Sequence, residues 1–399
     1  MNSELVKERI IAVVFSTRFL LAFLACIILV LLILFVIFFS YPPGWDFRNN
    51  LWAPAFLLIN GHSPYNITGL FELGSAVWMP VAIGMFWPFG YLPLQQASNL
   101  WWVLNLMSLI AIVWLSSGLR RPPRMLFAVT LVLAFIFPPT ISHFSLGQVT
   151  IFICLFFMVI SIYERKIHPM ILALLIVLIF SKPQLTIFIL PGYFFSYFKE
   201  NGFSRTLQLI LYLILTIGIL LLPLFVFYPQ WINDFIQNIT DNPAWAHPSS
   251  LFILRTTFKN IGEALWWLLL LIGSGVNLWL WARFPKREAM VWSLALTTLI
   301  TPYVWSWDFV LLIPLFTSHL YRKIPKTSSW LLFIALILCW GVIVYMKLTG
   351  QTSDELYWWV PWYVVGSILI ITSLAWSSAK SRLNTIFKLG FPSFLVGDD

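Results

Sequence analysis

Residues 19–47 read FLLAFLACIILVLLILFVIFFSYPPGWDF and join an apolar run to a polar loop. The run from Phe19 to Phe39 is long enough to cross the hydrocarbon core of a bilayer, which takes about 20 apolar residues in a helix. Asp46 follows a few residues beyond the end of that run, with Arg48 beside it. A carboxylate so close to lipid is costly, so we consider it a functional candidate, with a solvated loop acid as the alternative.

The composition indicates that the whole chain is a membrane protein. Of its 399 residues, 60% are apolar and only 10% are charged, whereas soluble domains carry about 25% charged residues. The net charge of +9 is spread over short loops between apolar segments, so it indicates orientation in the membrane and not nucleic-acid binding. The three cysteines lie inside apolar segments without metal or disulfide spacing, and we expect neither a metal nor another cofactor.

The apolar segments predict an all-α transmembrane bundle with about 12 spans, some of them short and broken. Helices of about 14 residues rise only about 21 Å, less than the hydrocarbon thickness of about 30 Å. Two such segments, 168–181 and 184–198, are therefore predicted to form a hairpin whose tip carries Lys182. The predicted spans lie near residues 19–40, 99–117, 125–138, 148–163, 168–181, 184–198, 205–228, 261–282, 289–303, 306–321, 329–346 and 359–378.

The basic residues predict the orientation. Of the 24 lysines and arginines, all but five fall on alternate connections together with the N-terminal segment. By the positive-inside rule both termini are cytoplasmic, and residues 1–399 form one multi-pass domain of the plasma membrane. Residues 41–98 and 229–258 then form long outward loops, the first with helices in the membrane interface anchored by Trp78 and Trp87. The five remaining basic residues are Arg48, Lys182, Arg255, Lys259 and Lys347.

Scarce polar side chains gather on the predicted outer face and are the candidates for a site. Each one also has an ordinary interpretation, such as a hydrogen-bonded loop histidine, a helix cap or a lysine contacting lipid headgroups. Their gathering on one face nevertheless suggests a shared cavity. These residues are Asp46, Arg48, His143, Gln148, Lys182, His247, Arg255, Lys259 and Asp308.

One outward carboxylate with cations nearby suits glycosyl transfer from a lipid phosphate. The acceptor hydroxyl must lose its proton as it attacks the anomeric carbon, and a carboxylate can take that proton. The departing phosphate is anionic, so a lysine or arginine must stabilise it. Because a phosphodiester is already an activated leaving group, the reaction does not strictly require a metal.

Five motifs occur in the order found in a known family. They are Asp46-Phe47 with Trp52-Ala53, Gly61-His62-Ser63-Pro64-Tyr65, Gly147-Gln148-Val149, Lys182-Pro183, and Thr301-Pro302 with Trp307-Asp308. On these motifs the chain resembles glycosyltransferase family 87, membrane enzymes of the GT-C class, over roughly residues 40–320. The family often has a histidine pair near the last motif, so Trp307-Asp308 leaves the role of that histidine unassigned.

The resemblance implies an inverting transferase with a polyprenyl-phosphate sugar as donor and Asp46 as the base. We expect a hexose, mannose in the first place, to pass to a glycolipid or glycan acceptor of the cell envelope. Lys182 and Arg255 are predicted to bind the donor phosphate, with Arg48 and Lys259 as lesser candidates. Residues predicted to contact donor or acceptor sugar are His143, Gln148, His247, Trp307 and Asp308.

Two other classes of function remain open from the sequence. A transporter or flippase for lipid-linked sugars would use Lys182 and Asp308 as coupling residues inside the membrane. The long outward loops would also fit a non-catalytic scaffold of the cell envelope. The sequence shows no inverted-repeat pattern, and its polar candidates lie on one face, which favours the transferase.

Overall fold

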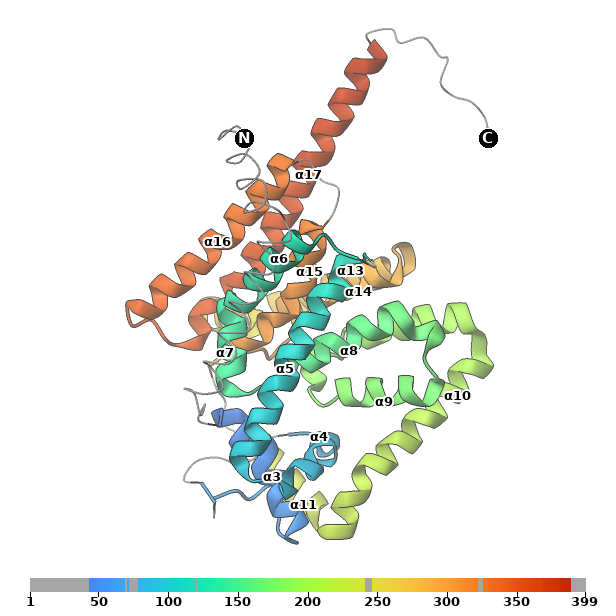
Figure 1. The fold of residues 1–399 in the computed structure, drawn as a ribbon, viewed down its shortest axis with the longest axis vertical. Coiled ribbons are helices and arrows are strands. Elements are labelled where there is room, and N and C mark those ends of the chain that lie inside the picture. The colour runs from blue at the N-terminus through green and yellow to red at the C-terminus, as the bar shows by residue number, and fades with distance from the viewer. Residues whose placement is uncertain are drawn as a thin grey trace, which may run out of the picture.

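The computed structural model describes residues 43–68, 70–71, 78–119, 121–240, 246–321 and 326–388, with backbone only for 326–327 and 375–388. This part of the chain is helical and contains no strand, which confirms the predicted all-α class. The expected first span, 19–40, lies outside the described residues. The molecule is elongated, with α16 and α17 at one end and α3, α4 and α11 at the other (Figure 1).

Each expected segment within the described residues contains a helix, although the boundaries differ by several residues. The expected spans 184–198 and 205–228 are the two halves of one element that is broken at Gly202, where φ is 74°. The longer elements are α5 (Leu94–Ser117), α6 (Arg124–Ile136), α8 (Thr150–Tyr163), α9 (Pro169–Ile179), α10 (Ile189–Phe227), α13 (Asn260–Arg283), α14 (Lys286–Ile300), η5 (Ser306–Leu312) followed by α15 (Ile313–Leu320), α16 (Lys326–Leu348) and α17 (Trp359–Lys388).

Shorter helices fill the connections between these elements. They are η1 (Phe47–Trp52), α3 (Ala53–Ile59), α4 (Pro80–Phe86), η2 (Trp87–Tyr91), α7 (Pro138–Leu146), η3 (Glu164–Lys166), η4 (Pro183–Leu185), α11 (Trp231–Thr240), α12 (Ser250–Phe258) and η6 (Asp354–Tyr357). Helices were expected within the first long loop, and α4 and η2 occupy that place. Trp78, expected as an anchor at the membrane surface, is buried within the protein.

The structure does not confirm twelve spans. Among the described residues, five helices are long and apolar enough to cross a membrane, or six if the bent pair α6 and α7, which meet at 62°, forms one span. The difference has a geometric cause. The helices α8, α9 and α14 have 14, 11 and 15 residues, and helices of that length reach only about 16–23 Å. Apolar composition therefore marks these segments as buried without making each of them a complete crossing.

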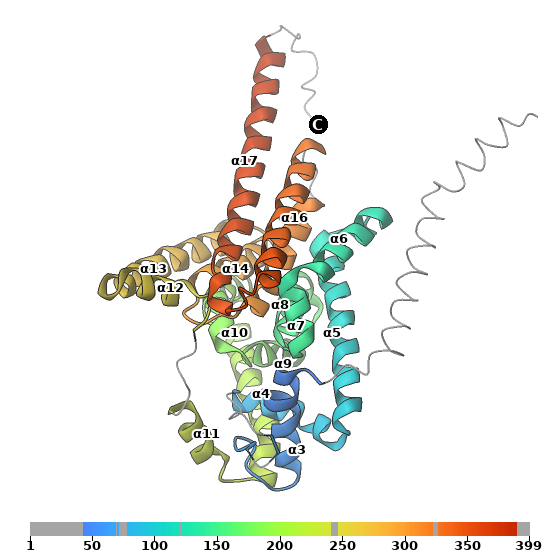
Figure 2. The ribbon, with the colours of Figure 1, turned by 90° about the vertical axis from the view of Figure 1, so that its left-hand side faces the viewer.

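The short apolar helices lie at the centre of the molecule. In Figure 1, α8 and α9 lie side by side and the first half of α10 packs beside α9. The pair α16 and α17 projects away from this centre, as Figure 2 shows from the side. One large cluster of buried apolar side chains runs through these helices. The ends of α7, α8 and α9 are consequently held at fixed positions, and His143, Gln148 and Lys182 lie at or next to these ends.

At the Tyr163 end of α8, charged side chains from η3, α10 and α14 meet. Lys286 lies 2.7 Å from Glu164 and 3.1 Å from Glu200, and Arg165 lies 2.9 Å from Glu200. We refer to these four residues as the ion-pair cluster. The sequence placed the basic members of this cluster on one membrane face, and the structure brings both of them to Glu200.

Candidate active site

Two glycines place Asp46 against the end of α7. A Cβ added to Gly44 would come closer than 3.0 Å to backbone atoms of Leu146 and Gly147, and one on Gly147 would lie 2.6 Å from the Cβ of Phe47. Gly147 also ends α7 with φ at 72°, a conformation that other residues adopt only with strain. The segment that carries Asp46 can therefore lie directly beside Gln148 because neither glycine has a side chain.

Asp46 itself directly precedes η1, a six-residue π-helix. Its Oδ1 accepts a hydrogen bond of 2.8 Å from the Asn50 side chain, four residues along the same helix. Short π-helical segments occur frequently at functional sites. Trp101 contacts the residues on both sides of this close approach. Its ring stacks on Phe47, and its indole N–H donates to the carbonyl of Gly147 at 2.8 Å.

Lys182 lies in the break between α9 and α10. Pro183 follows it and cannot continue the helix, because proline lacks the backbone N–H and restricts the residue before it. The tip of this hairpin is tied to the segment after α14 by the Thr301 hydroxyl, which donates to the Gln184 carbonyl at 2.6 Å. Trp78 covers the lysine, with Nζ 5.3 Å from the centre of the ring. The predicted hairpin is thus present, and its tip is buried.

Five side chains form one continuous hydrogen-bonded network, which we call the site network. The Gln148 amide donates to Asp46 Oδ2 at 2.5 Å and its carbonyl oxygen accepts from Lys182 Nζ at 2.7 Å. Lys182 also donates to Thr150 Oγ1 at 3.1 Å and to Asp308 Oδ1 at 2.9 Å. Thr150 donates in turn to Asp308 Oδ1 at 2.5 Å. Four residues that the sequence singled out, from four separate motifs, are therefore in direct contact.

The electrostatic balance of the site network differs between its two acids. Asp308 is fully buried and forms an ion pair with Lys182, whose side chain is 8% exposed. Within the described part of the chain, the hydrogen bonds that Asp46 receives come from the neutral amides of Gln148 and Asn50. Burial raises the pKa of Asp46 from 3.8 to about 6, although the Gln148 hydrogen bond and the Lys182 charge act in the opposite direction. At neutral pH Asp46 is therefore mostly ionised and able to accept a proton.

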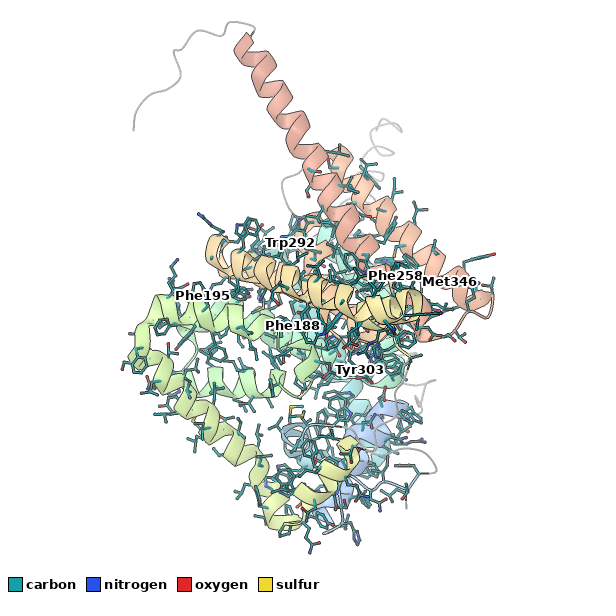
Figure 3. All side chains as sticks on the ribbon, turned by 180° about the vertical axis from the view of Figure 1, so that it is seen from behind. Phe188, Phe195, Phe258, Trp292, Tyr303 and Met346 are labelled. Atoms are coloured by element: carbon teal, nitrogen blue, oxygen red, sulfur yellow. The ribbon has the colours of Figure 1, made fainter. Side chains whose placement is uncertain are left out.

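Aromatic rings from the segment after α14 lie beside the site network. Trp305 and Trp307 are stacked with ring centres 4.7 Å apart, and Trp305 donates to the Tyr303 hydroxyl at 2.7 Å. The His247 ring lies 4.6 Å from that of Tyr303. Burial lowers the pKa of His247 to about 4, so this histidine is neutral at pH 7. Figure 3 shows Tyr303 beneath the hairpin formed by α12 and α13.

Other predicted site residues lie outside the site network. His143 is buried on α7 and contacts the Asn105 side chain at 3.1 Å. Arg48 donates to Asn49 at 2.8 Å and lies 4.4 Å above the ring of Phe71. Among the described residues, neither one is bonded to Asp46.

Two predicted phosphate ligands are on an exposed surface. Arg255 lies near the end of α12, half exposed, and pairs with the equally exposed Glu263 at 3.1 Å. Lys259 is exposed in the turn between α12 and α13. Within the described part of the chain, Lys182 is therefore the only one of the four predicted cations that joins the site network.

Sequence reasoning missed several members of the site. Asn50 lies four residues after Asp46, so helical spacing around the predicted acid would have found it. Thr150 lies two residues after Gln148, a spacing at which side chains of a helix do not face each other, so this spacing did not indicate it. Tyr303 and Trp305 belong to the segment between two predicted motifs, and their aromatic character was the available signal. Among the described residues, no group of three or more His, Cys, Asp or Glu side chains is arranged to hold a metal ion.

Fold and site together define the class of this protein. It is a helical, membrane-embedded protein in which the Gln148 amide joins a buried acid to a buried lysine. The model of glycosyltransferase family 87 matches residues 78–314. Because this segment is more than half of the chain, the protein belongs to that family. The match is shorter than the stretch of roughly 40–320 over which the motifs were noted, and Asp46 precedes it. Comparison with curated proteins and with solved structures gave no match.

Proposed function

We propose that this glycosyltransferase is an inverting enzyme of the GT-C class that takes a hexose, mannose in the first place, from a polyprenyl-phosphate donor. The acceptor is a glycolipid or glycan on the outer face of the membrane. The observation that carries the proposal is the Gln148 side chain, which bonds Asp46 with its nitrogen and Lys182 with its oxygen. Two hydrogen bonds and one amide group, or about 8 Å at most, thus separate the acid from the amine. The acid and the amine are therefore close enough to act on the same substrate.

In the proposed reaction, Asp46 acts as the general base. An acceptor hydroxyl attacks the anomeric carbon from the face opposite the phosphate, and its proton passes to Asp46. The bond between the anomeric carbon and the phosphate oxygen breaks, and the electron pair leaves with the phosphate. The configuration at the anomeric carbon is inverted because bond formation and bond cleavage occur on opposite faces. A pKa of about 6 for Asp46 suits this role at neutral pH.

Lys182 is the proposed partner of the leaving phosphate, which gains one negative charge in the reaction. A lysine has three N–H donors, and those of Lys182 are directed at Gln148, Thr150 and Asp308. A phosphate oxygen must therefore replace one of these acceptors or approach beside them. Holding the lysine in place before substrate binds lowers the reorganisation needed when the charge develops.

Trp307 and its stacked partner Trp305 are proposed to contact a sugar ring, because flat aromatic faces pack against the apolar C–H faces of sugars. His247 and His143 remain candidates for contacts with sugar hydroxyls. Asp308 is proposed to hold Lys182, with which it forms an ion pair. Since His247 is neutral at pH 7, it suits hydroxyl recognition better than phosphate binding.

The proposed placement of the site on the outer face rests on the positive-inside rule. The ion-pair cluster belongs to the basic connections assigned to the cytoplasm, and it follows the Tyr163 end of α8. The site network includes Thr150, the first residue of the same helix. The two groups are therefore separated by the length of α8, about 21 Å, which supports different membrane depths for them, with the site network nearer the outer face.

The donor class is testable with purified protein in liposomes. We expect sugar transfer from a polyprenyl-phosphate hexose, with inverted configuration in the product, and no transfer from a nucleotide sugar. Transfer from the nucleotide sugar alone would contradict the proposal.

The Asp46→Asn variant distinguishes an enzyme from a transporter. In the enzyme it should abolish transfer while the protein still folds. A protein that moves lipid-linked sugar across liposomes and keeps this activity with Asp46→Asn would instead be a flippase.

A further inference from the structure

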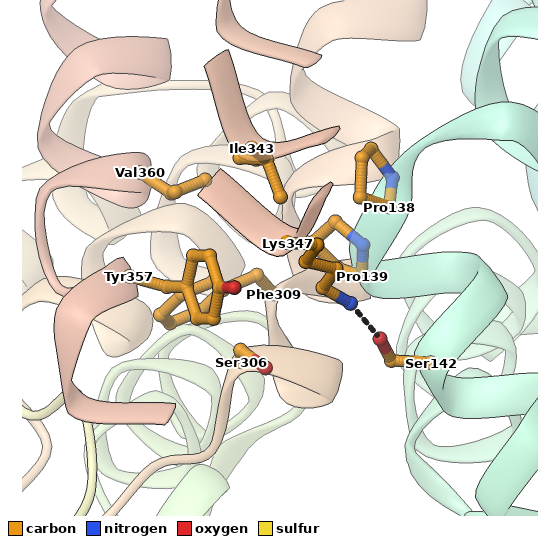
Figure 4. Close-up of a pocket in the computed structure, with 9 residues that line it drawn as sticks. All are labelled: Pro138, Pro139, Ser142, Ser306, Phe309, Ile343, Lys347, Tyr357 and Val360. Atoms are coloured by element: carbon orange, nitrogen blue, oxygen red, sulfur yellow. Dashed lines mark hydrogen bonds between the residues drawn. The ribbon is translucent and has the colours of Figure 1, made fainter. Parts of the chain in front are cut away.

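The turn between α16 and α17 contacts two segments that carry site residues, although it lies outside the family match. Lys347 donates to the Ser142 hydroxyl at 3.0 Å, and Ser142 belongs to α7, which leads to Gln148. Figure 4 shows this bond with Ser306 and Tyr357 nearby. These residues help to line a small pocket of about 10 Å³. Since one water needs about 10–15 Å³, the pocket is too small for a substrate.

Asp354, at the start of η6, makes the closest contacts of this turn with the site. Its Oδ2 accepts from the backbone N–H of Ser306 at 2.9 Å, and its Oδ1 accepts from the hydroxyl of the same serine. Ser306 begins η5, and the first N–H groups of a helix have no partner within it. The carboxylate supplies that partner, with a charge-assisted hydrogen bond. Asp354 thus fixes both the backbone and the side chain at the first residue of η5.

Ser306, which Asp354 holds, lies close in sequence to Asp308, the ion-pair partner of Lys182. Asp308 follows Ser306 by two residues, is fully buried, and receives the hydrogen bond of Lys182 at 2.9 Å. A shift of the start of η5 would move the Asp308 carboxylate, and Lys182 would move with it or lose its ion pair. A displacement of about 1 Å in such a site can cost roughly 100-fold in rate.

Aspartate is a common partner for the first N–H groups of a helix, but Asp354 lies where its charge has a cost. It adds a negative charge close to a site that already contains Asp46 and Asp308, whereas serine or asparagine would cap a helix without that charge. The two-point bond to Ser306 is stronger and more directional than a neutral cap would be. This suggests that an accurate position of η5 matters more here than the electrostatic cost.

We propose that Asp354 is a positioning residue of the active site: it holds Ser306, and thereby sets Asp308 against Lys182. The proposal rests on the function proposed above, in which Lys182 stabilises the leaving phosphate. Lys347 supports the same arrangement from the other side through Ser142.

The first test compares Asp354→Ala with Asp354→Asn in purified, folded enzyme. Asparagine can accept from the Ser306 N–H and donate to its hydroxyl, so it restores the clamp without the charge. We expect kcat/KM for the polyprenyl-phosphate sugar to fall about 30-fold in Asp354→Ala and less than threefold in Asp354→Asn. The matched control is Glu164→Ala, which removes another carboxylate with a two-point contact to one partner, Lys286, and should leave kcat/KM of the folded enzyme unchanged.

The second test does not depend on activity. Hydrogen–deuterium exchange of backbone amides should become about tenfold faster in Asp354→Ala within residues 303–312 and 181–186, and should stay at the wild-type rate in Asp354→Asn. If the wild-type protein transfers no sugar, the proposed function fails, and the exchange rates alone decide whether Asp354 holds η5 and Lys182. Unchanged exchange in Asp354→Ala, or a kcat/KM within twofold of the wild type, would overturn the positioning role.

Discussion

The two ends of α8 each carry acidic and basic side chains, yet their charges are balanced differently. In the ion-pair cluster, Lys286 and Arg165 face two glutamates, and the Arg165 side chain is 82% exposed. In the site network one buried lysine faces Asp308, and Asp46 lies beyond Gln148 and accepts hydrogen bonds from the neutral amides of Gln148 and Asn50. A balanced and partly exposed cluster contributes modestly to stability. A buried surplus carboxylate costs stability, and such a cost is typical of a site that performs chemistry.

The largest expected effect on sugar transfer is that of Asp46→Asn, at the site-network end of α8. Removing the general base should lower transfer about 10³-fold. The raised pKa of Asp46, about 6 in the folded protein against 3.8, means that its stabilising contribution is complete below about pH 4 and is lost as pH rises through 6. At about 1.4 kcal/mol per pKa unit, the ionised carboxylate costs about 3 kcal/mol at pH 8.

Thermal unfolding measured at two pH values tests whether the ionised Asp46 carboxylate destabilises the fold. Asp46→Asn should unfold at a higher temperature than the wild type at pH 8, and the two should converge at pH 4. A lower unfolding temperature for the variant at pH 8 would show that Asp46 is a structural acid.

The second prediction breaks the site network at its cation. Lys182→Met should lower transfer by about 10³-fold and the free energy of unfolding by about 3–5 kcal/mol, because Asp308 is left buried and unpaired. Combining Lys182→Met with Asp308→Asn should recover most of the stability and none of the transfer. Recovery of transfer in the double variant, measured with the lipid-phosphate donor, would exclude Lys182 as a phosphate ligand.

A third, smaller effect is expected from Gly44→Ala. The added methyl group would overlap backbone atoms of Leu146 and Gly147, so the segment with Asp46 must move away from Gln148. We expect transfer to fall about 100-fold, the usual scale for a displacement of about 1 Å. Gly218→Ala is the matched control, since a Cβ there meets nothing within 4 Å; equal losses in both variants would show that the close approach at Gly44 is unimportant.

The pH dependence of transfer sharpens the comparison further. Because Asp46 must be ionised to accept a proton, the rate should fall about tenfold for each pH unit below about 6 and be constant above it. Steady-state rates between pH 4.5 and 8 at saturating donor would show this. A rate that is flat across pH 5–7 would contradict a base with this pKa.

The smallest effect on catalysis is expected at the other end of α8. Glu164→Gln removes the carboxylate that Lys286 contacts at 2.7 Å, and the free energy of unfolding should fall by about 2 kcal/mol. Transfer by the folded enzyme should stay within twofold of the wild type. A change in KM for the donor would instead link the ion-pair cluster to the site.

The sequence predicted the main members of the site because they lie at helix ends with strong local signals. Pro183 ends the helix before Lys182, and Gly147 ends the one before Gln148. When the helix ends that carry Lys182 and Gln148 lie on the same side of the bundle, packing of the helices is enough to bring the two side chains together. Asp46 and Asp308 were found in the same way, from their places beside predicted spans.

Other features depended on packing that no local pattern contains. Arg255 and Lys259 are four residues apart on a helix, which predicted a shared face but not the direction of that face. Gly262 packs directly on the backbone of Leu254, and this close approach of α13 to α12 leaves Arg255 paired with Glu263 on the surface. The contact between Ser306 and Asp354 joins residues 48 positions apart, and no sequence spacing indicates it. Hydropathy likewise located the helices without showing which of them are too short to cross a membrane.

The break at Gly202 shapes the longest helix of the molecule. Unbroken, the 39 residues of α10 would extend about 58 Å, nearly twice the thickness of a hydrocarbon core. The helix changes direction at this break. Its first half begins beside the lysine hairpin, and its second half leads to α11, where Asp234 accepts hydrogen bonds from Ser63 and Tyr228. A Cβ at Gly202 would meet no neighbour within 4 Å, but its φ of 74° is a conformation that other residues adopt only with strain. Because glycine adopts it freely, a single helical element can begin beside the lysine hairpin and end beside α11.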